Sequence, residues 1–183
     1  MESKSSEHQE KGKVLIIEDD ERWKDILSGI LGFGGYEVTI ASTPSEAEEI
    51  LQQAEFFNLV TVELAVLADD GSRRMMLPSG GKVSNFMKNL CRFRSIPKIP
   101  TVDIVWPTER TLYPSVDVFH KSSSSEHPVS SILVISHYYN DVALQTAYQP
   151  YVLAALGKPF QADHFLKYVD AIVTATKQVS AYP

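Results

Sequence analysis

The stretch Val14-Leu15-Ile16-Ile17-Glu18-Asp19 decides the fold of this chain. Four apolar residues without alternation are typical of a strand that is buried on both faces, and here two acidic residues end the run. Three further apolar runs also lead into a polar residue: residues 59–62 into Glu63, 132–135 into Ser136, and 151–156 into Lys158. The chain is therefore predicted to place reactive side chains at the ends of buried strands.

Amphipathic helices separate the predicted strands. The first helix carries its apolar residues on one face and ends at the glycine-rich residues 32–35. The second begins at Thr43-Pro44-Ser45-Glu46, where threonine caps the helix and proline occupies its first turn. Strands that alternate with helices form βαβ units and a parallel sheet. We expect an α/β fold, a three-layer (βα)5 domain with strands near residues 13–17, 37–41, 58–64, 131–136 and 151–156.

The middle of the chain is less regular and reads as an insertion at about residues 68–130, between the third and fourth strands. An apolar stripe over residues 83–91 predicts an amphipathic helix with Lys88 and Arg92 on its opposite side. Two similar runs, residues 102–106 and 116–120, are candidates for a hairpin. A short helix is expected over residues 140–147. Residues 1–11 are expected to form a disordered tail, and residues 12–178 a single domain.

Composition indicates an ordinary globular protein of 183 residues with a net charge of −6. The single cysteine, Cys91, cannot form an internal disulfide, and no apolar run is long enough for a membrane helix. The N-terminus lacks the apolar segment of a signal peptide, so we expect a cytoplasmic protein. Charge is unevenly distributed, because residues 71–102 contain seven basic residues and no acidic one.

The ends of parallel strands meet at one edge of a sheet, where ligands gather. This edge is expected to bring together two acidic positions from the first strand, one from the third, a hydroxyl and a lysine, namely Glu18, Asp19, Glu63, Ser136 and Lys158. Neighbouring carboxylates repel one another and need a cation, a lysine or raised pKa values. Mg²⁺ suits oxygen ligands and is a candidate cofactor, and Lys158 is a candidate for neutralising part of the charge. His137, which follows Ser136, is a candidate for covering this acidic pocket.

These motifs together resemble the receiver domain of response regulators, the CheY-like superfamily, over about residues 13–64 and 131–175. The resemblance implies a flavodoxin-like fold with strand order 2-1-3-4-5. It also implies a metal site formed by Asp19, Glu63 and the carbonyl of Ala65. In receivers the hydroxyl and the lysine, here Ser136 and Lys158, contact the phosphoryl group. The peptide bond before Pro159 is expected to be cis.

Two positions depart from the receiver pattern. The phosphoacceptor position holds Glu63 instead of aspartate, and the aromatic switch position holds Ala155. Because glutamate is longer by one methylene, its carboxylate can reach toward the place of a phosphoryl oxygen. Our hypothesis is an atypical or pseudo-receiver that Glu63 holds permanently in an active-like state.

The expected function is signalling in a two-component-type system through protein contact that does not depend on phosphorylation, without enzymatic activity. The expected partner is a histidine kinase or a downstream effector, and a second copy of the chain is a further candidate. The candidate partner surface comprises Lys82, Lys88, Arg92, Trp106 and Phe119. One alternative is a Mg²⁺-dependent site that accepts or transfers a phosphoryl group. A second is binding of nucleic acid or an acidic partner by residues 73–98, although nucleic acid is not the partner we expect, nor is a membrane.

Overall fold

A computed structural model of the chain describes residues 10–54, 56–63, 65–67, 73–75, 85–100, 118–120, 129–137 and 152–180. In three short strands, β4 (Ala65–Leu67), β5 (Arg73–Met75) and β7 (Val118–His120), only the backbone is described. The expected helix over residues 140–147 and the run 102–106 lie outside these ranges, as do Lys82 and Trp106.

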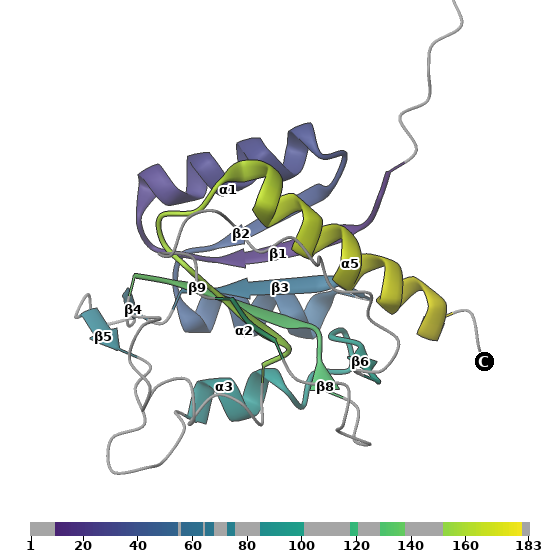
Figure 1. Ribbon diagram of the computed structural model, residues 1–183. Coiled ribbons are helices and arrows are strands. Elements are labelled where there is room, and N and C mark those ends of the chain that lie inside the picture. Colours follow the sequence, from purple (N-terminus) through teal and green to yellow (C-terminus); the bar gives the residue numbers. More distant parts are fainter. Residues whose placement is uncertain are drawn as a thin grey trace, which may run out of the picture.

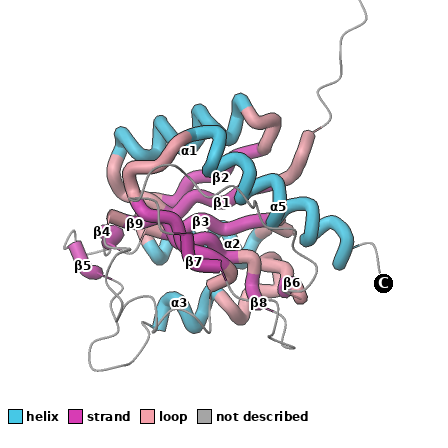
Figure 2. The backbone as a smooth tube through the Cα atoms, viewed as in Figure 1, coloured by secondary structure: helices cyan, strands magenta, loops and turns pink. Residues whose placement is uncertain are grey.

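A central sheet forms the middle layer of the fold (Figures 1 and 2). Its strand order is β2-β1-β3-β9-β10-β7. The strands are β1 (Lys13–Ile17), β2 (Glu37–Ala41), β3 (Leu59–Val62), β9 (Ile132–Ser136), β10 (Ala154–Gly157) and β7 (Val118–His120). The first five are parallel, and their order confirms the predicted 2-1-3-4-5 arrangement. The sixth strand, β7, pairs antiparallel with β10.

Helices cover both faces of this sheet. Leu27 and Leu31 of α1 (Glu21–Phe33) pack in one apolar cluster with residues of α5 (Ala162–Ser180). A second cluster, on the opposite face, holds residues of α2 (Pro44–Gln53) and α3 (Asn85–Leu90). Figure 1 shows α1 and α5 together on one side and α2 and α3 on the other, which gives the predicted three layers. Within the described residues, no helix is both long and apolar enough to span a membrane.

The helix ends follow the local signals in the sequence. Asp20 caps α1 by accepting hydrogen bonds from the backbone N–H groups of Arg22 and Trp23. Thr43 caps α2 by accepting from the backbone of Glu46 at 3.2 Å, and the Glu46 side chain accepts from Ser42 N at 2.7 Å. Such caps satisfy backbone donors that have no partner inside the helix.

Strand boundaries differ from the prediction at three places. The third strand spans Leu59–Val62 and not residues 58–64. The fourth strand begins at Ile132, one residue later than expected. The fifth begins at Ala154, three residues later than expected, and extends to Gly157. Val152 and Leu153 are almost fully buried although they precede the strand. An apolar run predicts burial, but it does not mark where the ladder of hydrogen bonds starts.

The insertion and the residues just before it form small pieces of sheet. β4 (Ala65–Leu67) and β5 (Arg73–Met75) pair antiparallel just after Glu63, and β6 (Lys98–Ile99) pairs with β8 (Val129–Ser130). The run 116–120, proposed as half of a hairpin, instead supplies β7 at the edge of the main sheet. The insertion thus adds a sixth strand to the edge of the central sheet.

The described chain also includes Glu10 and Lys11, which the sequence analysis assigned to the tail. The Lys11 backbone N–H donates to Gly35 O at 2.9 Å, and its ammonium group contacts Asp170 of α5 at 3.2 Å. These contacts join the start of the domain to the loop before β2 and to the last helix.

Candidate functional site

The register of the sheet places four side chains at one edge. Ile17 of β1 is paired with Val62 of β3, and Gly157 of β10 with Ser136 of β9. The residues that follow or end these strands are Glu18, Glu63, Ser136 and Lys158. All four are buried, with exposed fractions of 2%, 6%, 0% and 8% in that order. The edge therefore holds three ionisable groups that have little access to water.

Lys158 lies between the two glutamates. Its ammonium group donates a hydrogen bond to Glu18 Oε2 and another to Glu63 Oε2, the latter at 2.8 Å. Glu18 Oε1 accepts from the backbone N–H of Asp20 at 3.1 Å. Burial raises the pKa of Glu18, and the hydrogen bond and positive charge of Lys158 oppose that rise. Because a buried charge without a partner is costly, the lysine is the group that allows two carboxylates to stay in this pocket.

Glu63 also binds the hydroxyl group. Ser136 Oγ donates to Glu63 Oε1 at 2.6 Å, so each carboxylate oxygen of Glu63 accepts a hydrogen bond from a different side chain. The Glu63 backbone N–H donates to Ile17 O at 2.9 Å and ties its strand end to β1. Glu63 therefore links three strand ends through its own main chain and side chain.

An aromatic group covers the lysine. The Trp23 ring lies over Lys158 Nζ at 4.5 Å from the ring centroid, a cation–π contact. Trp23 also contacts the rings of His137 and Phe160, at centroid distances of 5.6 and 5.5 Å. The sequence analysis named His137 as a candidate cover and did not single out Trp23 for this pocket. The position of Trp23 three residues after the helix cap Asp20, beside the acidic loop, was the available signal.

The remaining predicted positions are placed as follows. Asp19 is half-buried in the loop between β1 and α1, and Ala65 begins β4. Ala155, at the switch position, is 7% exposed and lies in β10 opposite Val134 and Phe119. The Lys158–Pro159 peptide bond is cis, as predicted.

The described residues do not fit a Mg²⁺ site in this arrangement. They contain no group of three His, Cys, Asp or Glu side chains placed to hold a metal ion. The oxygens of Glu18 and Glu63 already accept from a lysine, a backbone amide and a hydroxyl. A dication that binds these two carboxylates would compete with the Lys158 ammonium group for them, and its positive charge would repel the ammonium group.

The candidate partner surface is described only in part. Lys88 is half-buried on α3, and Arg92 is exposed just beyond its end. Met87 and Leu90 of the same helix are fully buried, which confirms that α3 is amphipathic with the predicted orientation. Phe119 lies in β7, where the backbone alone is described.

Comparison with known proteins places this arrangement in a recognised fold. No protein-family model matches the chain, and no curated protein matches it. Solved structures do. A CheY-like response regulator receiver domain from Methanospirillum hungatei has 16% sequence identity and a TM-score of 0.57, covering 91% of this chain and 97% of its own.

Two other receiver domains give similar agreement. The non-phosphorylated HemR receiver domain from Leptospira biflexa is 17% identical with a TM-score of 0.54, over 88% of this chain and 94% of its own. The receiver domain of a sensor histidine kinase from Pseudomonas aeruginosa, with magnesium coordinated in its active-site cleft, is 12% identical with a TM-score of 0.54. That match covers 89% of this chain and 98% of the other. The chain therefore has the fold of CheY-like response regulator receiver domains, with Glu63 and Lys158 in contact at the carboxyl edge of its sheet.

Proposed function

We propose that this protein is a receiver-like signalling module that acts by binding a protein partner and needs no phosphorylation. One observation carries the proposal: the two oxygens of Glu63 accept hydrogen bonds from Ser136 at 2.6 Å and from Lys158 at 2.8 Å. The resemblance to receivers assigns a hydroxyl and a lysine in these places to the phosphoryl group. Here a side-chain carboxylate of the protein takes both contacts.

The chemistry of the pocket supports a fixed state. A carboxylate that accepts hydrogen bonds from a buried hydroxyl and a buried ammonium group is a poorer nucleophile, because these donors stabilise its negative charge. Attack of Glu63 on a phosphoryl donor would have to compete with these contacts. Ser136 is fully buried and points toward Glu63, which is the inward position that phosphorylation would otherwise have to induce.

The proposed partner surface is basic. Exposed basic residues follow α3, namely Arg92, Arg94 and Lys98. Such a cluster favours a partner that presents acidic side chains, because complementary charge speeds association and selects the partner. A histidine kinase and a downstream effector are the two partner classes that we propose, and Lys88 and Arg92 are the first residues to test in either case.

The magnesium of the Pseudomonas aeruginosa receiver raises a second candidate function, a Mg²⁺-dependent phosphoryl acceptor. The two proposals are separated by incubating the protein with radiolabelled acetyl phosphate and Mg²⁺. We expect the wild-type protein to take up no acid-stable, alkali-labile label.

The matched variant for this experiment is Glu63→Asp. The shorter carboxylate should withdraw from Ser136 and Lys158 and leave room for a phosphoryl group, so we expect Mg²⁺-dependent label to appear. Label on Glu63 of the wild-type protein would overturn the proposal. An unlabelled E63D variant that is folded would show that the length of Glu63 is not what prevents phosphorylation.

A further inference from the structure

A pocket of about 630 Å³ lies at the opposite edge of the sheet from Glu63. It opens between the beginnings of β1 and β2, the end of α2 and the segment that leads into β3. β1 separates the two edges: Lys13, its first residue, lines the pocket, and Glu18 follows its last. Five strand residues span roughly 17 Å, so this pocket is separate from the site described above. Its volume lies in the range of small-molecule sites, about 300–1,000 Å³.

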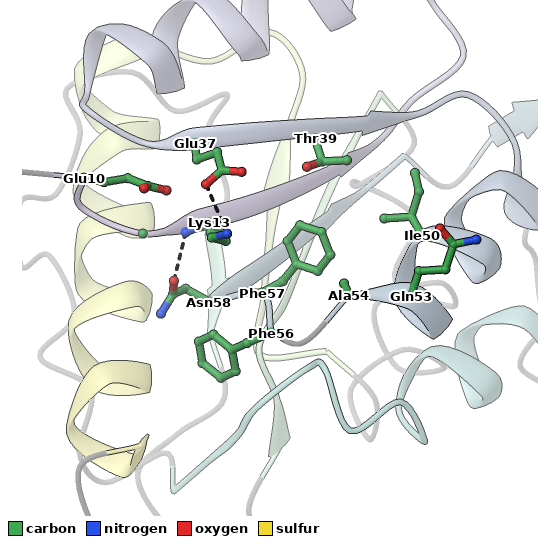
Figure 3. A pocket seen from close by; sticks show the side chains of 11 residues that line it. Glu10, Lys13, Glu37, Thr39, Ile50, Gln53, Ala54, Phe56, Phe57 and Asn58 are labelled. Atoms are coloured by element: carbon green, nitrogen blue, oxygen red, sulfur yellow. Dashed lines mark hydrogen bonds and ion pairs between the residues drawn. The ribbon is translucent and has the colours of Figure 1, made fainter.

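The pocket has an apolar side and a charged end. Figure 3 shows Glu10, Glu37 and Lys13 at one end, and Ile50 and Gln53 of α2 with Ala54, which follows that helix, at the other. The ring of Phe57 lies between them, and that of Phe56 lies below Asn58 in this view. Phe57 is only 4% exposed and Ile50 is half-buried, whereas Glu10, Lys13 and Glu37 are exposed. A bound molecule would therefore rest its body on buried apolar groups and place its head among exposed charges.

Among the described residues that line the pocket, Glu10 and Glu37 are acidic and Lys13 is basic. Glu37 Oε2 lies 3.3 Å from Lys13 Nζ, and the positive charge of Lys177 also acts on Glu10. A hydrogen bond with Glu37 raises the pKa of Glu10, and the same bond lowers the pKa of Glu37. The two carboxylates repel each other at the rim, and a second cation placed between them would attract both.

The backbone around the pocket is held firmly. Asn58 Oδ1 accepts from the Lys13 backbone N–H at 2.9 Å, and Asn58 Nδ2 donates to Thr176 of α5 at 3.1 Å. Gly12 has a φ of +153°, and a side chain there would lie 2.7 Å from the Asn58 amide oxygen. Glu37 N donates to Gly12 O at 2.9 Å. These bonds fix the strand beginnings from which Lys13 and Glu37 project.

We propose that this pocket binds an organic cation, an ammonium or guanidinium group carried on a compact apolar body. The cationic group would lie between Glu10 and Glu37, and the body would contact Phe57 and Ile50. A free amine and a basic side chain of a protein partner share this chemistry. The proposal is independent of the state of Glu63, because the two sites share no residue.

The test is a titration of the isotope-labelled full chain, followed by nuclear magnetic resonance. The probe is 2-phenylethylamine, and 2-phenylethanol is the neutral molecule of the same shape. We expect the amine to cause saturable shifts of the Gly12, Thr39 and Asn58 amides. The alcohol lacks the positive charge and should bind roughly tenfold more weakly, a difference of about 1.4 kcal/mol in binding free energy. A blocked peptide with adjacent phenylalanine and arginine gives the second arm. Tighter binding of the peptide identifies a protein partner as the source, and tighter binding of the amine identifies a free ligand.

Variants decide whether the acids are responsible. The double variant E10Q/E37Q should weaken binding of the amine roughly tenfold or more. Its control, D25N/E49Q, removes the same charge from two exposed positions outside the pocket and should bind normally. The single variant E63Q should also bind normally. The proposal is overturned if neither the amine nor the peptide causes saturable shifts, if the alcohol binds as tightly as the amine, or if E10Q/E37Q binds as the control does.

Discussion

One additional methylene in Glu63, compared with aspartate, allows its carboxylate to reach two donors at once. Ser136 Oγ and Lys158 Nζ come from different strands, yet both lie within 2.8 Å of Glu63 oxygens. Because Glu63 accepts hydrogen bonds from both donors, Ser136 and Lys158 are held in place by the protein itself and need no phosphoryl group for this. At this scale, the state of the pocket depends on single contacts that substitutions can remove one at a time.

The first prediction concerns the hydroxyl group of Ser136. Replacing it by alanine leaves Glu63 Oε1 buried without its donor, and hydrogen bonds to charged groups are worth about 1.5–3 kcal/mol. We expect Ser136→Ala to lower the free energy of unfolding by about that amount in urea titrations. Ser136→Thr, which keeps a hydroxyl, should lose less. Equal stability of S136A and wild type would mean that the contact with Glu63 contributes nothing.

The second prediction concerns the pH dependence that Glu18 produces. Burial raises its pKa above the ordinary value of 4.5, so the folded state holds the Glu18 proton more tightly than the unfolded state does. The stability linked to this group is fully present below pH 4.5 and is lost as the pH rises through the folded pKa. Glu18→Gln removes this dependence and keeps the shape of the side chain.

The check is urea unfolding of both proteins at several pH values above 4.5. The stability of wild type relative to E18Q should fall as the pH rises in this window. A constant difference would show that the pKa of Glu18 is the same in the folded and unfolded states, and an increasing difference would show that Lys158 outweighs burial.

At the scale of elements, the start of α1 connects helix capping to the pocket. Asp20 accepts hydrogen bonds from Arg22 N at 3.0 Å and Trp23 N at 3.2 Å, and its own backbone N–H donates to Glu18. The same turn therefore orients the Trp23 ring over Lys158 and holds the Glu18 carboxylate. Loss of the cap should loosen both.

The third prediction follows from this turn. Asp20→Ala should lower the free energy of unfolding by about 1 kcal/mol, the usual cost of losing a helix cap. Asp20→Asn retains an oxygen acceptor and should remain within a few tenths of wild type. Chemical shifts of the Lys158 side chain, which senses the Trp23 ring current, should change in D20A and not in D20N. Unchanged Lys158 shifts in a destabilised D20A would separate the cap from the pocket.

The same scale shows which parts of the fold local sequence can predict. Some signals act over only a few residues, namely the caps at Thr43 and Asp20 and the apolar run 14–17. The first two helices and the first strand can therefore be predicted from their own sequences. The β7 strand depends on pairing with β10, more than thirty residues later, and no local pattern identifies that partner. The two-residue pair β6 and β8 is likewise set by tertiary contacts.

The candidate site divides in the same way. Glu63, Ser136 and Lys158 could be named from sequence because parallel strands must end at a common edge. Which acid faces the lysine could not, since Glu18 and Asp19 are adjacent and only the backbone path places Glu18 against Lys158. The Trp23 contact was missed because apolar periodicity gives the face of a helix and not what that face meets.

At the scale of the whole molecule, the two edges of the sheet differ in how their charges are satisfied. The carboxyl edge is buried, and its charges pair with one another. The amino edge is open, and the described residues that line its pocket include the acids Glu10 and Glu37 and the base Lys13. β1 and β3 reach both edges, so a disturbance of one edge can be tested for its effect on the other.

The last prediction uses hydrogen exchange of the whole chain in the Glu63→Ala variant. Removing the carboxylate deletes the links from β3 to Ser136 and Lys158, so the strand ends lose a common anchor. We expect faster exchange of the Glu18 and Lys158 amides, which donate to Ala41 O and Ser136 O at this edge. The Asn58 and Val60 amides, which donate to Lys13 O and Ser131 O toward the amino edge, should keep wild-type protection.

Glu37→Gln, at the amino edge, is the matched control and should leave the exchange of the Glu18 and Lys158 amides unchanged. Uniformly faster exchange in E63A would mean that Glu63 contributes only to global stability. Loss of protection confined to the carboxyl edge is the result expected if Glu63 sets the state of that edge.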